Sequence, residues 1–300
     1  MNKLVLDVGG SAIKWAVMGD EASIIEKGDV KTPLDCFDNF LKVIVELFES
    51  KKDIDGIAIS LPGNIDVSTG QVYAPGALSF NANRNIVDEI QKVIKVPVSV
   101  ENDGKCAALA EVWKGKLKNH KDGIVLIIGT GIGGGVVIDR KVLKGQHFFA
   151  GEFSYLITDI NRPDFSSAFA LSGSASALCG TYARLKNLDS KDVNGKLVFE
   201  KVKENEPEAV EALDRMTKSL AVQIYNLQCS FDPELILIGG GVSKQEILLT
   251  KIKEKLEEVY AGIPPFFTIP HAVVEACEFF NDSNLIGALY HYLNGGKIDA

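Results

Sequence analysis

The chain has 300 residues, of which 46% are hydrophobic, and its formal net charge is −8. The length favours about two domains, each with enough apolar residues for a core of its own. The acidic balance argues against non-specific binding to nucleic acid or to an anionic membrane, because both require a basic protein surface.

The N-terminal residues carry no targeting pattern. Asp7 and the glycines after it come too early for the apolar segment of a signal peptide, and no uninterrupted apolar run reaches the roughly 18 residues of a membrane span. The five cysteines are far apart and form no CxxC pair, so we expect reduced thiols and no disulfide frame. These features indicate a cytoplasmic protein.

The first predicted element is a hairpin over residues 4–17. Apolar residues flank a tight turn at Gly9, Gly10 and Ser11, and Asp7 stands just before that turn. Since glycine has no Cβ, the backbone N–H groups of such a turn can point at phosphate oxygens. Taken alone, however, a plain tight turn is the simpler interpretation of these two glycines.

Helices and strands then alternate up to residue 113. Apolar residues at helical spacing predict a helix over 36–50, followed by a strand over 54–61 that ends at Pro62-Gly63. A helix over 87–94, a short strand over 96–100 and an alanine-rich helix over 103–113 complete the first half. This order is typical of an α/β fold.

The second half begins with another glycine hairpin, over residues 125–138, that repeats the design of the first. A loop-rich stretch over 150–175 leads to a strongly helical region over 175–231. A buried strand from Leu235 ends at the glycines 239–241, and an amphipathic helix follows over 245–260. The last predicted helix, over 283–293, is apolar enough to pack on the rest of the chain.

The second hairpin formally contains the dinucleotide-binding pattern GxGxxG, at Gly129, Gly131 and Gly134. A helix should follow that pattern, whereas a β-branched strand follows here, so we reject a Rossmann fold. The P-loop pattern GxxxxGK[ST] is absent as well. Three glycine clusters at strand ends nevertheless favour phosphate binding over three unrelated turns.

Two carboxylates, Asp7 and Asp103, are assigned different roles. Beside a phosphate-binding turn, Asp7 would repel phosphate unless a divalent cation lay between them, so it fits a magnesium site reached through water. A turn residue that bonds its own backbone is the alternative for Asp7. Asp103 lies where a strand passes into a helix, so it is the helix N-cap, a base that accepts a hydroxyl proton, or both.

Five short motifs stand together in one order along nearly the whole chain. They are Asp7-Val-Gly-Gly-Ser11, Leu61-Pro-Gly63, Glu101-Asn-Asp-Gly104, the glycine-rich stretch 129–135 with Gly151-Glu152, and Gly239-Gly-Gly241. In this order and spacing they resemble the ROK family of sugar kinases. Each motif alone is unspecific, but five in register are specific. The resemblance implies an α/β, two-lobed, actin-like (ribonuclease H-like) ATPase fold with its active site in the cleft between the lobes.

The resemblance also implies lobes, ligands and site residues. A small lobe would span residues 1–115, completed by a helix over 283–300, and a large lobe would span 116–282. Asp103 would be the base that takes the proton from the sugar hydroxyl, and Asp7 would hold Mg²⁺. The other implied sugar ligands are Asn81, Asn102 and Glu152. The implied ATP-binding residues are Asp7, Gly9, Gly10, Ser11, Gly129, Thr130, Gly131, Gly133, Gly134, Gly239, Gly240 and Gly241. Loop asparagines such as Asn81 and Asn83 are also common turn formers.

The chain departs from the family pattern after Glu152. Many members continue with Gly-His and a cysteine-rich zinc segment, whereas Phe153-Ser-Tyr155 follows here and the region lacks the Cys and His ligands of a zinc site. We therefore expect no zinc. A pocket without those groups could admit a larger sugar, so we favour phosphorylation of the 6-hydroxyl of a β-glucoside such as cellobiose over glucokinase or N-acetylmannosamine kinase activity.

A non-catalytic, sugar-sensing transcriptional regulator is the alternative of another class. Such ROK proteins carry a helix-turn-helix extension before the first hairpin, whereas this chain starts with the hairpin. A sensor would also be expected to have lost the base, and Asp103 is present. The resemblance further implies sugar and ATP as small-molecule partners, no nucleic acid or membrane partner, and a homodimer.

Overall fold

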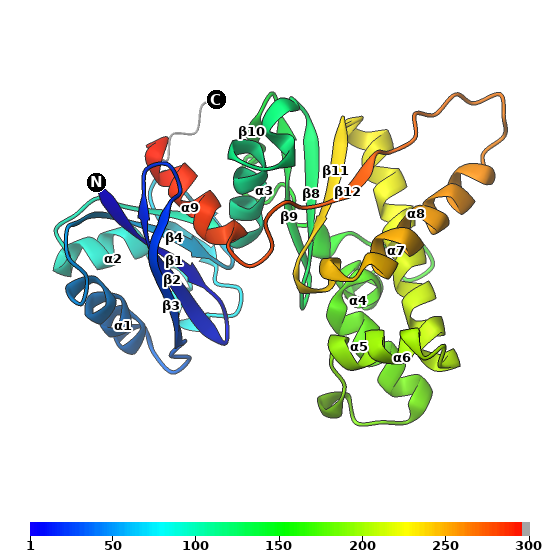
Figure 1. The fold of residues 1–300 in the computed structure, drawn as a ribbon, viewed down its shortest axis with the longest axis horizontal. Helices are drawn as coiled ribbons and strands as arrows, with labels where there is room; N and C mark the ends of the chain where they lie inside the picture. The colour runs from blue at the N-terminus through cyan, green and yellow to red at the C-terminus, as the bar shows by residue number, and fades with distance from the viewer. Residues whose placement is uncertain (296–300) are drawn as a thin grey trace. The chain divides into compact units, whose positions relative to one another are not determined.

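Strands and helices alternate through both halves of the chain, as the sequence predicts (Figure 1). The computed structural model describes residues 1–295. Two compact units are distinguished: unit 1 comprises residues 1–118, 141–150 and the chain from Asp282 onward, and unit 2 comprises 119–140 and 151–281. The sequence gives no sign that the short segment 141–150 clusters with unit 1, because both of its flanks belong to unit 2.

Unit 1 is built on a mixed sheet with the strand order β3-β2-β1-β4-β7. Its strands are β1 (Asn2–Val8), β2 (Ala12–Gly19), β3 (Ile24–Lys31), β4 (Ile54–Leu61) and β7 (Val98–Asn102). The first three are antiparallel neighbours, whereas β4 runs parallel to β1 and β7 runs parallel to β4. β3 escapes prediction because its residues are largely exposed and lack the apolar pattern of a buried strand. A small hairpin of β5 (Asn64–Asp66) and β6 (Gln71–Ala74) follows β4.

Four helices pack on this sheet. They are α1 (Phe37–Glu49), α2 (Ile86–Val93), α3 (Asp103–Trp113) and α9 (Ser283–Leu293). α1 and α2 share a core with alternate residues of β1 and β4, whereas α3 and α9 pack closely against each other. Gly287 of α9 allows this close approach, because a Cβ there would collide with the carbonyl oxygen of Cys106 in α3. Of the helix predicted over 283–300, residues 296–300 lie outside the described residues.

Unit 2 repeats the pattern of a hairpin followed by parallel strands. Its strands are β8 (Gly123–Ile128), β9 (Ile132–Ile138), β11 (Leu235–Gly239) and β12 (Val274–Ala276), in the order β9-β8-β11-β12. β8 pairs antiparallel with β9 and parallel with β11. The short strand β10 (Lys141–Val142) begins the segment that clusters with unit 1.

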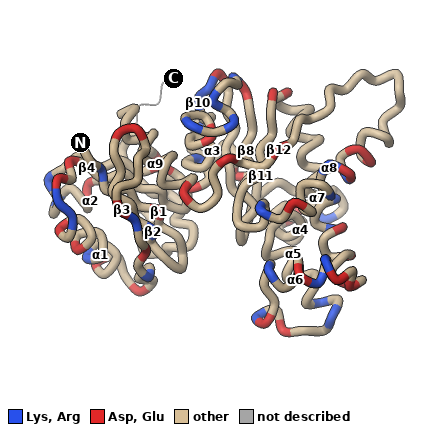
Figure 2. Tube along the Cα trace, in the orientation of Figure 1, with Lys and Arg blue, Asp and Glu red and all other residues tan. Residues whose placement is uncertain are grey.

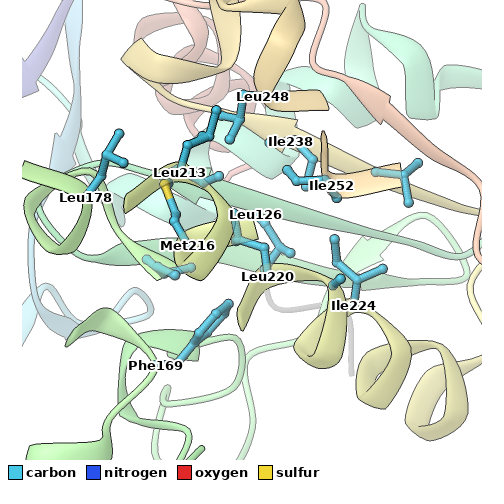
Figure 3. Close-up of a cluster of buried hydrophobic side chains, with 14 of the residues drawn as sticks. Leu126, Phe169, Leu178, Leu213, Met216, Leu220, Ile224, Ile238, Leu248 and Ile252 are labelled. Atoms are coloured by element: carbon cyan, nitrogen blue, oxygen red, sulfur yellow. The ribbon is translucent and has the colours of Figure 1, made fainter. Parts of the chain in front are cut away.

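The helices of unit 2 form a large apolar core with its sheet. They are α4 (Ala170–Gly173), α5 (Ala175–Lys186), α6 (Gly195–Lys203), α7 (Pro207–Phe231) and α8 (Glu246–Ala261). Figure 3 shows Leu213, Met216 and Leu220 of α7 gathered with side chains of β8, β11 and α8. This core fixes the glycine turns at the ends of β8 and β11.

Positions of Lys and Arg are interspersed with positions of Asp and Glu along the elements of each unit (Figure 2). Within residues 1–295, no helix has the combination of length and apolar character needed to cross a membrane.

Candidate active site

The carboxyl ends of three neighbouring parallel strands bring the predicted residues of unit 1 together. In the sheet register Asp7 of β1 lies opposite Ser60 of β4, and Leu61 lies opposite Asn102 of β7. Ligands of α/β proteins bind at this edge, where the loops that follow the strands meet. The first glycine turn, the Pro62-Gly63 turn and the start of α3 therefore lie along one edge of the sheet.

Asp7 is held by side chains from three other elements. Its Oδ1 accepts hydrogen bonds from Asn284 Nδ2 at 2.9 Å and Ser60 Oγ at 3.3 Å, and its Oδ2 lies 3.5 Å from Lys14 Nζ. These partners orient the carboxylate, in contrast to the alternative of a turn residue that bonds its own backbone. The hairpin register, which sets Asp7 opposite Lys14, could have revealed the lysine, whereas Asn284 is too distant in sequence to be foreseen.

Asp7 is compatible with magnesium. Mg²⁺ commonly keeps several waters and uses one or two carboxylates together with substrate phosphates, so a single oriented carboxylate is sufficient. Residues 1–295 contain no group of three or more His, Cys, Asp or Glu side chains that could enclose a metal ion.

Thr32 holds the first glycine turn by two hydrogen bonds. Gly9 N–H donates to the carbonyl of Ala12 at 3.0 Å, and Thr32 Oγ1 donates to the Gly9 carbonyl at 2.7 Å. Thr32 N–H also donates to the carbonyl of Ser11 at 3.3 Å. The turn is thus fixed from the end of β3 while Ser11 stays exposed. Thr32 was missed by the sequence analysis because it lies outside every motif.

The structure at the start of α3 excludes the N-cap role for Asp103. Asn102 is the N-cap: its Oδ1 accepts from the N–H of Lys105 at 3.0 Å, and its Nδ2 donates to the carbonyl of Gly63 at 2.9 Å. Asp103 is the first helical residue, so its interpretation as the N-cap is wrong. Its Oδ1 accepts from Gly104 N–H at 2.8 Å, and the side chain is partly exposed in the first turn, where the helix dipole favours an anion.

Glu101, the residue before the N-cap, is completely buried. Its Oε1 accepts from the N–H of Asn102 at 2.7 Å, and its Oε2 pairs with Lys144 Nζ. Burial acts to raise the pKa of Glu101, but the positive charges of Lys144 and, in part, His291 and Lys105 outweigh burial and hold the pKa below its ordinary value. The motif Glu101-Asn-Asp-Gly104 does not by itself indicate a role for Glu101.

The side-chain amide of Asn81 is buried without a hydrogen-bond partner in the described chain. Asn81 closes the single turn η1 (Ser79–Asn81), its side chain is 0% exposed, and neither Nδ2 nor Oδ1 has a hydrogen-bond partner among residues 1–295. Buried polar groups are normally paired, and an unpaired one costs about 1–3 kcal/mol. The Oδ1 of Asn64, at the start of β5, is also buried and unpaired within the described chain. Asn83, by contrast, is exposed with φ +56°, as expected of a turn former.

The glycine turn of the second hairpin lies in unit 2. Gly129 N–H donates to the carbonyl of Gly131 at 3.0 Å, and Thr130 at the tip is exposed. Ser154 closes the turn, since its Oγ accepts from the N–H of Ile132 at 2.8 Å and donates to the carbonyl of the same residue at 3.1 Å. A Cβ at Gly129 would have no atom closer than 4.0 Å, so internal packing does not require glycine there.

The remaining glycines separate into those that the fold requires and those that it does not. Gly134 of β9 has φ +147°, and Gly240 has φ +93° with a Cβ position that would collide with the carbonyl of Ile128. A Cβ at Gly239 would collide with the side chains of Ile127 and Cys277, whereas a Cβ at Gly241 would meet nothing within 4 Å. Gly133 lies within β9. Among the glycines predicted to bind ATP in unit 2, Gly129 and Gly241 therefore have the open space that the close approach of a ligand requires.

Glu152 lies in unit 2, directly before the short turn η3 (Phe153–Tyr155). The segment after it is pinned by a bridge between Ile157 and Ala168 and exposes large apolar side chains. Among them, Ile160 is 90% exposed and Phe165 is 62% exposed.

Comparison with known proteins gives a consistent result. The model of the ROK family matches residues 3–294. A beta-glucoside kinase from Klebsiella pneumoniae is 31% identical over 295 residues, which cover 97% of this chain and 96% of that protein.

Two solved structures are similar over the whole fold. Protein Lmo2764 of Listeria monocytogenes, provisionally named an N-acetylmannosamine kinase, superposes with a TM-score of 0.89 at 28% identity and covers 99% of this chain and 100% of that one. A ROK family protein from Streptococcus pneumoniae, solved in complex with sucrose, gives a TM-score of 0.89 at 26% identity and covers 99% of both chains. The predicted actin-like ATPase fold is confirmed by these neighbours.

Proposed function

The chain belongs to the ROK family, and from this membership we propose that it is an ATP-dependent carbohydrate kinase whose acceptor is a β-glucoside, phosphorylated at its 6-hydroxyl. The enzyme class follows from relatives that are named kinases over nearly their full length. The acceptor and the hydroxyl are the parts that require a test.

The observation that carries the proposal is the unpaired amide of Asn81. The side-chain amide of Asn81 has two N–H donors and one acceptor oxygen, which match sugar hydroxyls that both donate and accept hydrogen bonds. Because Asn81 is 0% exposed, the proposal requires the chain around η1 to open when the sugar binds. Asn102 contributes mainly by shaping the site, because its amide already bonds Lys105 and Gly63.

Three observations support a β-glucoside over a monosaccharide. The similar Klebsiella pneumoniae protein is named a beta-glucoside kinase. A similar ROK structure was solved with sucrose, an α-glucoside, which supports room for a second sugar ring but does not bear on the β-linkage. The chain also carries Phe153-Ser154-Tyr155 after Glu152 where many members continue with Gly-His, which leaves one polar sugar contact fewer. Glu152 is the remaining acidic sugar ligand that we propose.

The reaction is a direct in-line transfer. Asp103 accepts the proton of the sugar hydroxyl while the hydroxyl oxygen bonds the terminal phosphorus of ATP and the bond to the leaving ADP oxygen breaks. The N–H groups of the turns around Gly10, Gly129 and Gly241 bind phosphate and nucleotide oxygens. Mg²⁺ bound through water to Asp7 would supply further neutralisation of phosphate charge.

Three further features belong to the same proposal. Units 1 and 2 are proposed to be the small and large lobes, with the segment 141–150 moved to the small lobe and the boundary moved from 115 to 118. A cytoplasmic location is proposed because the reaction requires ATP. A homodimer belongs to the same proposal, and the exposed apolar side chains of Ile160 and Phe165 are candidates for its interface. Light scattering on the purified protein measures the oligomeric state directly.

The acceptor is tested by measuring ADP release with Mg²⁺ and ATP against gentiobiose, cellobiose, aryl β-glucosides, glucose and N-acetylmannosamine. We expect the highest kcat/KM with a β-glucoside and a phosphorus–proton NMR correlation at its C6 protons. Turnover with a monosaccharide alone would support the kinase activity but contradict the β-glucoside as acceptor. No sugar-dependent ADP release at all would instead favour a sensing role.

A further inference from the structure

Three ionisable side chains lie buried behind the start of α3 and take no part in the chemistry described above. They are Glu101 at the end of β7, Lys144 in the segment 141–150 and His291 on α9, with side chains that are 1%, 14% and 8% exposed. All three belong to unit 1. Charged groups are seldom buried unless they are paired, so this arrangement needs a physical account.

Glu101 links the catalytic turn to Lys144. One of its oxygens accepts the N–H of Asn102, the residue that caps α3 and immediately precedes the base Asp103. The other oxygen pairs with Lys144 Nζ and lies 3.7 Å from His291 Nδ1. A shift of the carboxylate would therefore move the backbone from which Asp103 projects.

The segment that carries Lys144 is fastened to unit 1 at two further points. Lys105 Nζ, on α3, donates to the carbonyl of Phe148 at 3.2 Å. Asn64 Nδ2, on β5, donates to the carbonyl of His147 at 2.9 Å. These contacts hold the segment 141–150 against both the helix that starts at Asp103 and the strand that follows Gly63.

Lys144 is the main counter-charge of Glu101. Burial lowers the pKa of His291, and the nearby Lys144 lowers it further, although Glu101 acts in the opposite direction. Of the groups around Glu101, the Lys144 ammonium makes the direct ion pair. Without it, a fully buried carboxylate would have to take up a proton or move.

We propose that Lys144 is a positioning residue for phosphoryl transfer: through its ion pair with Glu101 it fixes the Asn102–Asp103 turn, so that Asp103 meets the acceptor hydroxyl. The proposal rests on the function proposed above. Neither residue touches the acceptor in this account, and both act through the backbone of the turn.

Kinetics of Lys144→Met and Lys144→Arg test the proposal, with Lys3→Met as the matched control. Lys3 is a similarly buried lysine of unit 1, paired with Asp55 at 2.8 Å at the other end of β1. We expect Lys144→Met to lower kcat by about tenfold to a hundredfold, as small misplacements of catalytic groups do, with a smaller change in acceptor KM. Lys144→Arg should recover most of kcat, and Lys3→Met should keep kcat while its thermal midpoint falls.

A double-mutant cycle tests whether Lys144 acts through Glu101. Glu101→Gln removes the buried charge, so the variant Glu101→Gln with Lys144→Met should lose no more turnover than Lys144→Met alone. Fully additive losses would overturn the proposal. An unchanged kcat in Lys144→Met, or an equal loss in Lys3→Met, would overturn it as well.

Amide hydrogen exchange separates this proposal from the kinase proposal. Because the Asn102 N–H donates to Glu101, its exchange should accelerate by about tenfold or more in Lys144→Met and stay unchanged in Lys3→Met. An unchanged Asn102 amide would refute the positioning role even in an active kinase. Absence of sugar-dependent ADP release by the wild-type protein would refute the kinase, whatever the exchange shows.

Discussion

Replacement of Asn81 by leucine tests whether the unpaired amide is a ligand-binding group. Each unpaired buried polar atom costs about 1–3 kcal/mol, and leucine keeps the branched shape while removing both atoms. Since the larger branches of leucine offset part of this gain, we expect the free protein to become more stable by about 1–3 kcal/mol. Acceptor binding should weaken about tenfold to a hundredfold, because two hydrogen bonds of about 0.5–1.5 kcal/mol each are lost.

Thermal unfolding with and without saturating acceptor, together with titration calorimetry, measures both effects. The thermal midpoint of the variant without acceptor should rise by about 2–4 °C per kcal/mol of added stability. Saturating acceptor should raise the midpoint of the variant by less than it raises that of the wild type. Ser99→Ala is the matched control, since Ser99 Oγ on β7 is also buried without a partner in the described chain. That control should gain stability and keep acceptor affinity. A less stable Asn81→Leu protein with unchanged acceptor affinity would refute the reasoning.

Three further predictions follow from the same structure. Asp103→Asn should keep acceptor and ATP binding but lose at least about a hundredfold in kcat, because an amide cannot accept the hydroxyl proton; near-normal turnover would exclude it as the base. Gly241→Ala should raise KM for ATP with little change in thermal midpoint, whereas Gly240→Ala should lower the midpoint because of its positive φ; the opposite pattern would reverse their roles. The pKa of Glu101 is lowered by folding, so its stabilisation is present above its ordinary pKa and is lost as pH falls through the folded value. The free energy of unfolding, measured from neutral to acidic pH, should therefore fall more steeply for the wild type than for Glu101→Gln.

Local sequence patterns predicted the helices and strands around the candidate site. The contacts between residues far apart in the sequence could not be predicted. The helix over 103–113, predicted from its alanine-rich sequence, and the strand over 54–61, predicted from its apolar residues, both have the predicted bounds, because one segment alone determines these signals. The contact of Asn284 with Asp7 joins residues 277 positions apart, and no local signal announces it. The placement of Lys144 beside Glu101 escaped prediction for the same reason, since the segment 141–150 leaves its sequence neighbours to cluster with unit 1.

Hydrogen-bond pairing assigns roles that residue type leaves open. Asn81 and Asn102 were both predicted to bind the sugar, yet the amide of Asn102 already bonds the Lys105 N–H and the Gly63 carbonyl, whereas that of Asn81 bonds nothing in the described chain. An amide already engaged within the protein has less capacity for a ligand, and an unpaired buried amide is destabilising until a ligand meets it. Under the proposed function, the cost of burying Asn81 unpaired would be stability given up for binding. By the same reasoning, the paired charge of Glu101 is a means of holding Asp103 in place, and sugar affinity and turnover should respond separately to changes at these two positions.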